Sequence, residues 1–129
     1  MPRLAEIMRA EPIVVAPEDT LGEVAERMTA DNVGAVIVKD YGRLIGILTE
    51  RDMLKAMAAR VHTSEARVRQ WMTEEPVTAS ADADAEDAAQ IMLENGFRHL
   101  PVVDESGAVA GIVSLRRVVA ATKHAPDPA

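Results

Sequence analysis

Apolar residues recur along the chain with two alternating spacings. Short runs rich in β-branched residues predict three strands, over residues 13–16, 35–39 and 44–48. Between them, apolar residues at every third or fourth position predict a helix from Leu21 to about Asp31, which Asp19 or Thr20 can cap. A second helix is expected to open at Thr49. The predicted order is strand, helix, strand, strand, helix.

The same pattern returns 64 residues later, where Met28 matches Met92 and Val38 matches Val102. One inserted residue then shifts the offset to 65. The second copy has strands over 77–79, 99–103 and 109–113 and helices over 83–94 and 114–122. Two similar halves usually pack about a pseudo-twofold axis, and the interface between them is a natural ligand site.

The predicted organisation follows from this repeat. The segments are a first repeat at 1–60, a linker at 61–70, a second repeat at 71–123 and a mobile tail at 124–129. The linker is expected to hold a short helix that is capped near Thr63 and leads to Trp71. Because a half of about 60 residues would be marginally stable alone, we expect the two repeats to share one core.

Composition narrows the classes of function. A net charge of −7 opposes non-specific binding to nucleic acid or anionic lipid. The chain has no cysteine, so disulfides and thiolate metal sites are excluded. No segment approaches the ~20 apolar residues of a membrane-spanning helix, and the start of the chain lacks the apolar core of a signal peptide. The expectation is a soluble cytoplasmic protein with neither nucleic acid nor membrane as partner.

Both copies carry segments that resemble a pair of CBS domains, the repeat named after cystathionine β-synthase. The segments of the first copy are 7–15, 34–38 and 42–52, and those of the second are 71–78, 97–104 and 107–114. The resemblance implies an α/β Bateman module of two units packed through their sheets, as in stand-alone CBS-domain proteins. It also implies two clefts between the repeats, which often bind AMP, ADP, ATP or S-adenosylmethionine.

The family pattern has Thr or Ser followed three residues later by Asp, whose carboxylate binds the ribose hydroxyls. Here that element is Thr49 and Asp52. A carboxylate can accept from two neighbouring hydroxyls, and a hydroxyl at a helix start can approach a phosphate. The same spacing also fits a capping box at a helix N-terminus. Both interpretations stay open, and they are compatible.

The second copy departs from the pattern, with Ser114 followed by Arg117 in place of the Asp. A guanidinium cannot accept a hydrogen bond from ribose. In the family, basic residues at the start of a strand reach the phosphates of a nucleotide held by the other repeat. Arg98 and His99 occupy that place, although they also fit an exposed strand end. The resemblance therefore implies one cleft with Asp52 on one side and these basic residues on the other.

By the same resemblance, the base would lie against Ala16, Leu21, Val33 and Ile112, with the backbone near Val33 and Gly34 reading its edge. The predicted ligand-binding residues are thus Ala16, Leu21, Val33, Gly34, Thr49, Asp52, Arg98, His99 and Ile112.

Other chemistry has little support in the sequence. His62, His99 and His124 lie far apart, so no metal site is expected. Ser114, His99 and Asp104 could be written as a triad, but no nucleophile elbow surrounds Ser114. We expect no enzymatic activity and no required cofactor.

Two hypotheses remain. The first is a small-molecule-sensing regulatory module that binds an adenosine-containing ligand in one cleft, forms a homodimer and acts on a separate, unidentified protein. The alternative is a ligand-independent dimerisation or scaffold module. In that case Met53, Met57, Val118 and Val119 would lie on helices that pair across a twofold axis.

Overall fold

The computed structural model describes residues 2–123, and the structural statements below concern these residues. The chain divides into two compact units. The first-repeat unit is Ile13–Pro76, and the second-repeat unit combines Met1–Pro12 with Val77–Ala129. The spatial units therefore differ from the predicted sequence repeats in two places. Residues up to Pro12, in the first sequence repeat, belong to the second-repeat unit, and residues 71–76, in the second sequence repeat, belong to the first-repeat unit.

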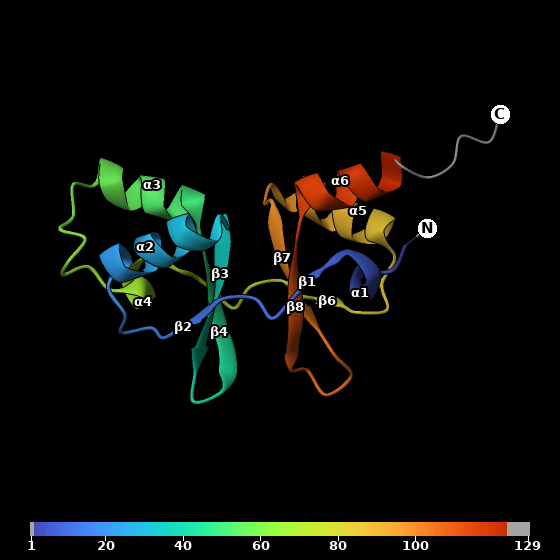
Figure 1. The fold of residues 1–129 in the computed structure, drawn as a ribbon, viewed down its shortest axis with the longest axis horizontal. Coiled ribbons are helices and arrows are strands. Elements are labelled where there is room, and N and C mark those ends of the chain that lie inside the picture. The colour runs from blue at the N-terminus through green and yellow to red at the C-terminus, as the bar shows by residue number, and fades with distance from the viewer. Residues whose placement is uncertain (1, 124–129) are drawn as a thin grey trace. The chain divides into compact units, whose positions relative to one another are not determined.

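The first-repeat unit is a four-stranded sheet with helices. Its elements are β2 (Val14–Val15), α2 (Leu21–Asp31), β3 (Ala35–Asp40), β4 (Arg43–Thr49), α3 (Glu50–Ala58), α4 (Val68–Trp71) and β5 (Thr73–Glu74). The sheet order is β2-β3-β4-β5, in which β2 is parallel to β3 and the other pairs are antiparallel (Figure 1). Since α2 joins the parallel strands, this part of the unit is a short βαβ crossover.

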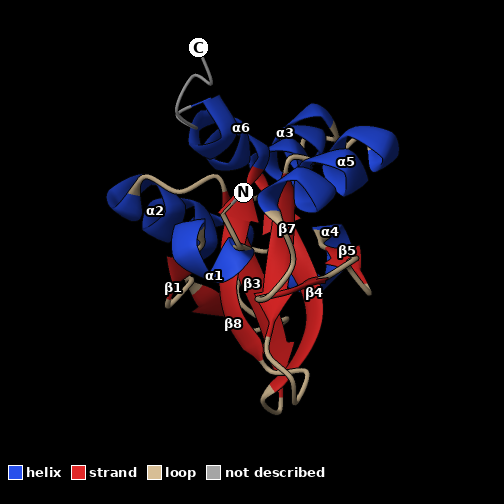
Figure 2. Ribbon diagram, turned by 90° about the vertical axis from the view of Figure 1, so that its right-hand side faces the viewer, coloured by secondary structure: helices blue, strands red, loops and turns tan. Residues whose placement is uncertain are grey.

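The second-repeat unit has the same architecture. Its elements are α1 (Leu4–Ile7), β1 (Arg9–Ala10), β6 (Ala79–Ser80), α5 (Ala85–Asn95), β7 (His99–Val103), β8 (Val109–Ser114) and α6 (Leu115–Lys123). The sheet order is β1-β8-β7-β6. Each unit thus contains a long hairpin, β3–β4 or β7–β8, that ends in a loop (Figure 2). The predicted α/β fold class with tandem repeats is confirmed.

Each unit has its own core, so the expectation of one shared core is wrong. In the first-repeat unit, residues of α2 such as Leu21 and Val24 pack with Val36 of β3, Leu48 of β4 and Ala56 of α3. The core of the second-repeat unit consists mainly of Leu4, Ala85, Ala88, Met92, Leu100, Val102, Val113 and Val118. Two small cores suffice because each repeat is completed by a segment from outside its own sequence copy.

The opposite face of each sheet is also apolar. Side chains alternate along a strand, so Ile37 and Ile47 point away from the face that carries Val36 and Leu48. Ile112 has the same relation to Val113 in β8. The helices of each unit pack on the face that carries Val36 and Leu48 in the first-repeat unit and Val113 in the second.

Several predicted boundaries need correction. The linker helix begins at Val68, after Arg67, and residues 63–65 form a turn instead of its cap. Its position is set by tertiary bonds, since the Val68 N–H donates to the Asp19 carbonyl (2.9 Å). The strand predicted at 77–79 lies at 79–80, where it pairs with β7, and Val77 is exposed. The sequence interpretation missed α1, β1 and β5, which are too short to show a period.

Two repeated glycines mark close approaches between backbones. A Cβ atom added at Gly46 would lie 2.7 Å from Met72 Sδ and 2.9 Å from the Thr73 carbonyl oxygen. A Cβ atom at Gly111 would lie 2.7 Å from both Met8 Sδ and the Arg9 carbonyl oxygen. These contacts explain why glycine recurs with methionine in both copies: the glycine admits the short edge strand that completes each sheet.

Candidate functional site

The candidate site is centred on the N-terminus of α3, where Thr49 and Asp52 form a reciprocal capping box. The Asp52 N–H donates to Thr49 Oγ1 (3.3 Å), while the Thr49 N–H and hydroxyl donate to Asp52 Oδ2 at 2.9 and 3.0 Å. Asp52 is 7% exposed and is one of only two buried polar or charged residues among those that the structure describes. These capping bonds use Oδ2 and leave Oδ1 able to accept from a further donor.

The same motif at α2 shows what capping alone looks like. There the Thr20 hydroxyl donates to Glu23 Oε1 (2.8 Å), and the Glu23 N–H donates to Thr20 Oγ1 (3.2 Å). The bond from the Thr20 hydroxyl, and a weaker one from the Thr20 N–H (3.3 Å), hold the pKa of the Glu23 carboxyl below its ordinary value. Glu23 is exposed, whereas Asp52 is buried. The capping interpretation of Thr49 and Asp52 is therefore confirmed, and burial distinguishes Asp52 from an ordinary cap.

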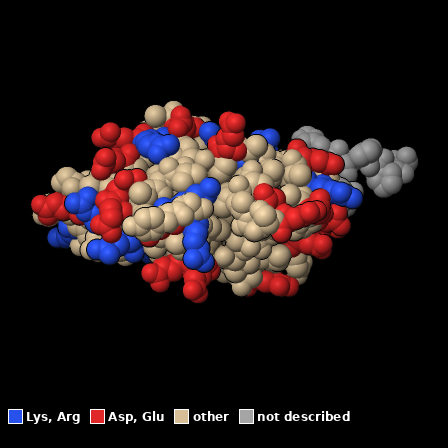
Figure 3. All heavy atoms as spheres, turned by 90° about the horizontal axis from the view of Figure 1, so that it is seen from below, with Lys and Arg blue, Asp and Glu red and all other residues tan. Residues whose placement is uncertain are grey.

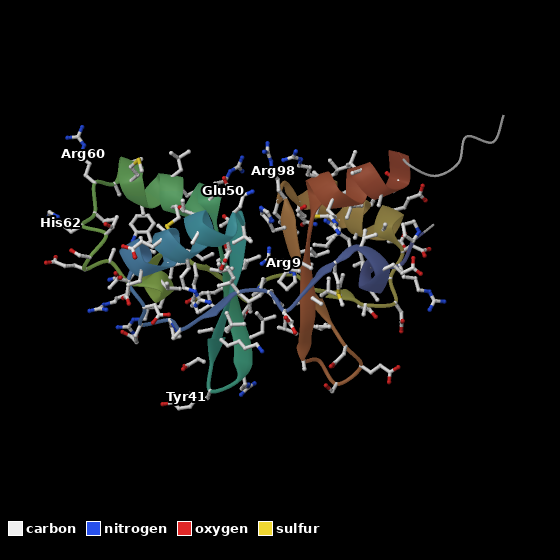
Figure 4. The ribbon with its side chains drawn as sticks, in the orientation of Figure 1. Arg9, Tyr41, Glu50, Arg60, His62 and Arg98 are labelled. Atoms are coloured by element: carbon white, nitrogen blue, oxygen red, sulfur yellow. The ribbon has the colours of Figure 1, made fainter. Side chains whose placement is uncertain are left out.

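The loop before β3 lies against this helix start. The Glu50 N–H donates to the Gly34 carbonyl (3.0 Å), and Ala35 pairs with Thr49 in the sheet. Figure 4 shows Glu50 at the beginning of α3. Val33 is half-buried and packs on the core of the unit. The structure thus brings four predicted site residues together within one unit, namely Val33, Gly34, Thr49 and Asp52.

Two further predicted residues of this unit have different surroundings. Ala16 is exposed, and its N–H donates to Asp19 Oδ2 (2.9 Å) in the turn before α2. Leu21 is 1% exposed and belongs to the core. Its side chain therefore supports the first turn of α2 from inside and does not form part of the surface.

The remaining predicted residues belong to the second-repeat unit. Arg98 is exposed just before β7 (Figure 4), and its carbonyl accepts from the Leu115 N–H (2.8 Å). His99 begins β7 and pairs with Ser114. Ile112 lies on β8 between its partners Arg9 and Pro101. A common cleft for these residues and Asp52 stays a prediction.

Arg117 has a partner that no sequence pattern indicated. Its N–H donates to Ser114 Oγ (3.1 Å), which caps α6, and its side-chain Nε donates to the Ile7 carbonyl oxygen (3.0 Å). The position that carries Asp in the first repeat therefore binds the protein's own backbone in the second.

A separate shallow hollow of about 410 Å³ lies in the first-repeat unit, outside the predicted site. Its lining residues are Val61, His62, Glu65, Ala66, Gln70 and Trp71. Figure 4 shows His62 on the segment between α3 and α4. Within residues 2–123, no three His, Asp or Glu side chains are grouped as they would be to hold a metal ion.

Charge on the described surface is mixed. On the face that Figure 3 shows, Lys and Arg side chains occur among Asp and Glu side chains and do not form one broad basic patch. Asp104, in the loop after β7, accepts from Ser106 and from the Ala108 N–H, which lowers the pKa of its carboxyl. This carboxylate stabilises a turn, so its position gives no support to a catalytic triad.

The helix surfaces proposed for dimerisation also need correction. Val118 is 0% exposed and lies in the core of its unit, and Met53 packs against the core of the other. The outward apolar side chains are Leu54 and Met57 on α3, 65% and 72% exposed, and Val119 on α6. Met57 and Val119 are thus exposed as the hypothesis expects, whereas Met53 and Val118 face the cores.

Comparison with known proteins identifies the family. The CBS domain model matches residues 4–59 and 68–124, which is most of the chain. The fold, with two four-stranded α/β units, agrees with that match. The chain therefore belongs to the CBS domain family, as a tandem pair.

Relatives extend this assignment. A 17.7 kDa protein of Acidianus ambivalens is 38% identical over 115 residues, which cover 88% of this chain and 69% of that protein. Some other relatives are much longer: the match covers only 16% of the meiotically up-regulated gene 70 protein of Schizosaccharomyces pombe, which is 36% identical over 118 residues.

Solved structures of similar proteins include two with bound ligands. CBSX2 of Arabidopsis thaliana in complex with AMP is 26% identical, with a TM-score of 0.77 over 95% of this chain and 97% of that one. The CBS domain pair of protein MJ0100, in complex with 5-methylthioadenosine and S-adenosyl-L-methionine, is 26% identical. Its TM-score is 0.85 over 95% of this chain and 97% of that chain.

One further observation concerns membranes: no helix within residues 2–123 combines the length and apolar character needed to span a bilayer.

Proposed function

We propose that this CBS pair is a non-enzymatic sensor that binds one adenosine-containing ligand between its two repeats. The observation that carries the proposal is the buried carboxylate of Asp52, fixed by Thr49 through one oxygen only. A buried carboxylate is costly unless it is well partnered. The two hydroxyls of a ribose would donate hydrogen bonds to the Asp52 carboxylate, mainly to Oδ1, which does not accept from Thr49.

The proposed contacts of the ligand follow from the neighbours of Asp52. Val33 and Gly34 lie beside the start of α3, where their backbone groups can meet the base. Arg98 and His99 would bind the negatively charged part of the ligand, since charge-assisted hydrogen bonds to phosphate are strong. Ala16 and Ile112 would contact the base, with Leu21 supporting Ala16 from the core.

The ligand-bound relatives support this choice of ligand class. AMP, 5-methylthioadenosine and S-adenosylmethionine share adenine and ribose and differ in the group beyond the ribose. A carboxylate that recognises ribose serves all of them. We therefore propose AMP, ADP, ATP or S-adenosylmethionine as regulatory ligands, with no permanently bound cofactor.

A ligand held by Asp52 and Arg98 would bridge two units and so stabilise one arrangement of them. Such a ligand shifts a conformational equilibrium by its difference in affinity for the two states. The shift would be transmitted to a homodimer or to a separate regulated protein.

The test is isothermal titration calorimetry with AMP, ADP, ATP and S-adenosylmethionine. Asp52→Ala should weaken binding roughly 5- to 150-fold, because losing a hydrogen-bonded charged anchor costs about 1–3 kcal/mol. Glu23→Ala is the matched control, since it removes an equivalent capping carboxylate at α2 and should leave affinity unchanged. Absence of binding by all four compounds at millimolar concentration would contradict the proposal.

The exposed side chains of Leu54 and Met57 favour a second candidate, a ligand-independent dimerisation module. Neighbouring exposed apolar residues on one helix are typical of an interface. Sedimentation of the wild type and of Met57→Asp, with and without AMP, separates the two candidates. A dimer that Met57→Asp dissociates, and that forms equally without ligand, would favour the scaffold.

A further inference from the structure

The segment of residues 2–12, here called the strap, completes the second-repeat unit from the far end of the chain. Leu4 is fully buried in the core of that unit. The Leu4 N–H donates to the Ala83 carbonyl (2.9 Å), and Arg9 pairs with Ile112 on the edge of β8. The strap thus covers both a core position and a sheet edge.

The first-repeat unit has a counterpart to the strap at a constant offset of 64, the segment around α4. The backbone bonds are the same, because the Val68 N–H donates to the Asp19 carbonyl just as Leu4 does to Ala83. This counterpart has an additional fastening. Arg69 Nε lies 2.9 Å from Glu18 Oε1, so a charged pair joins α4 to the turn before α2.

The strap lacks that fastening. Ala5 stands where the counterpart has Arg69, so Asp82, the equivalent of Glu18, has no such partner on α1. Arg3 approaches Asp82 only to 3.8 Å, whereas Arg69 and Glu18, whose side chains are similarly exposed, approach to 2.9 Å. An exposed pair at that distance contributes little.

Arg117 supplies a different fastening at the other end of α1. Its Nε donates to the carbonyl of Ile7, the last residue of that helix. The equivalent residue of the first repeat, Asp52, bonds to Thr49 instead. The two repeats therefore differ at two equivalent positions. The first repeat has Arg69 and Asp52, and the second has Ala5 and Arg117 in their places.

We propose that the strap is releasable and that Arg117 is its latch, the residue whose hydrogen bond to Ile7 holds the strap in place. This bond takes the role that the Arg69–Glu18 ion pair has in the first repeat. In the first repeat, the ion pair fastens the counterpart segment and leaves position 52 available to a ligand. In the second repeat, position 117 is committed to the strap. The strap has one short helix, one two-residue strand and one fully buried large side chain, so it opens locally before the unit unfolds.

Opening of the strap has a defined structural effect. It would expose the edge of β8 at Gly111 and Ile112 and the core position that Leu4 fills. An open sheet edge is a site where another strand can add. Arg117 therefore controls whether this edge is covered by the chain itself.

Limited trypsin digestion tests the latch, because the strap contains a cleavage site after Arg9, within β1. Arg117→Ala should increase cleavage at Arg9 and exchange of the Leu4 and Ala5 amides by about 3- to 10-fold, since an exposed charge-assisted hydrogen bond contributes roughly that factor to an equilibrium. Arg116→Ala is the control, because Arg116 is an exposed neighbour without a hydrogen bond or ion pair among the described contacts.

A second variant tests the replacement directly. Ala5→Arg in the Arg117→Ala background should restore protection by pairing with Asp82, as Arg69 pairs with Glu18. Equal cleavage of Arg117→Ala and Arg116→Ala would overturn the proposal. Loss of amide protection throughout α5 in Arg117→Ala would also overturn it, since Arg117 would then support the whole unit. Failure of Ala5→Arg to restore protection would refute the equivalence of the two fastenings.

Discussion

Gly46→Ala tests the close approach between β4 and β5. The added methyl group would lie 2.7 Å from Met72 Sδ and 2.9 Å from the Thr73 carbonyl oxygen. A methionine side chain can move, but Thr73 belongs to β5 and is held by its pairing with Ile47. Overpacking typically costs about 1–3 kcal/mol, and because a backbone carbonyl must move, we expect about 3 kcal/mol in the free energy of unfolding.

The matched control is Gly42→Ala in the β3–β4 loop. A Cβ atom there would meet nothing within 4 Å, but the residue has φ +76°. Its cost is therefore backbone strain alone, about 1 kcal/mol. Both glycines lie on the same hairpin, so the difference of about 2 kcal/mol isolates the steric contact.

Urea denaturation followed by the fluorescence of Trp71 is a suitable assay, because it is the sole tryptophan and lies in the same unit. With a typical urea dependence of about 2 kcal/mol per molar, Gly46→Ala should lower the midpoint by about 1.5 M. If Gly46→Ala is no more destabilising than Gly42→Ala, β5 is not tightly packed on β4, and our explanation of the repeated glycines is wrong.

Two further predictions concern exposed groups. Tyr41 is 97% exposed at the tip of its hairpin (Figure 4) and has φ 51°, so Tyr41→Asn should raise stability slightly, by about 0.5 kcal/mol, in thermal denaturation. A clear loss of stability would reveal a contact of the ring. The pKa of Glu23 is lowered from 4.5 by its bonds with Thr20, so its contribution is present above pH 4.5 and is lost as the pH falls through the lowered value. Glu23→Gln should therefore weaken the acid dependence of stability between pH 3 and 5, measured by urea midpoints; an unchanged dependence would contradict this.

The sequence was sufficient for features that depend on local chemistry. Thr20 and Thr49 begin their helices as predicted, because a capping hydroxyl acts within three residues. The same short spacing predicted that Asp52 completes the cap at Thr49. Strands β1 and β5 were missed because a two-residue strand has no period, and its existence depends on a partner elsewhere in the chain.

The contact of Arg117 was hidden for the same reason. Its partner carbonyl belongs to Ile7, 110 residues away, and a backbone carbonyl leaves no trace in residue type. Comparison of the two copies showed that position 117 was unusual but not what it binds. Similarly, the helical period of α6 did not reveal that Val118 faces inward and Val119 outward.

The pairing of β1 with β8 also sets the order in which the chain can fold. Arg9 is synthesised roughly a hundred residues before its partner Ile112, which is an interval of about 5–20 s at the usual rates of translation. The first-repeat unit, which uses only Ile13–Pro76, can form during that interval. Strand β1 is therefore synthesised before the whole first-repeat unit but can pair only after β8 has been made, so the unit that lies between them in the sequence can fold while the strap is still unpaired.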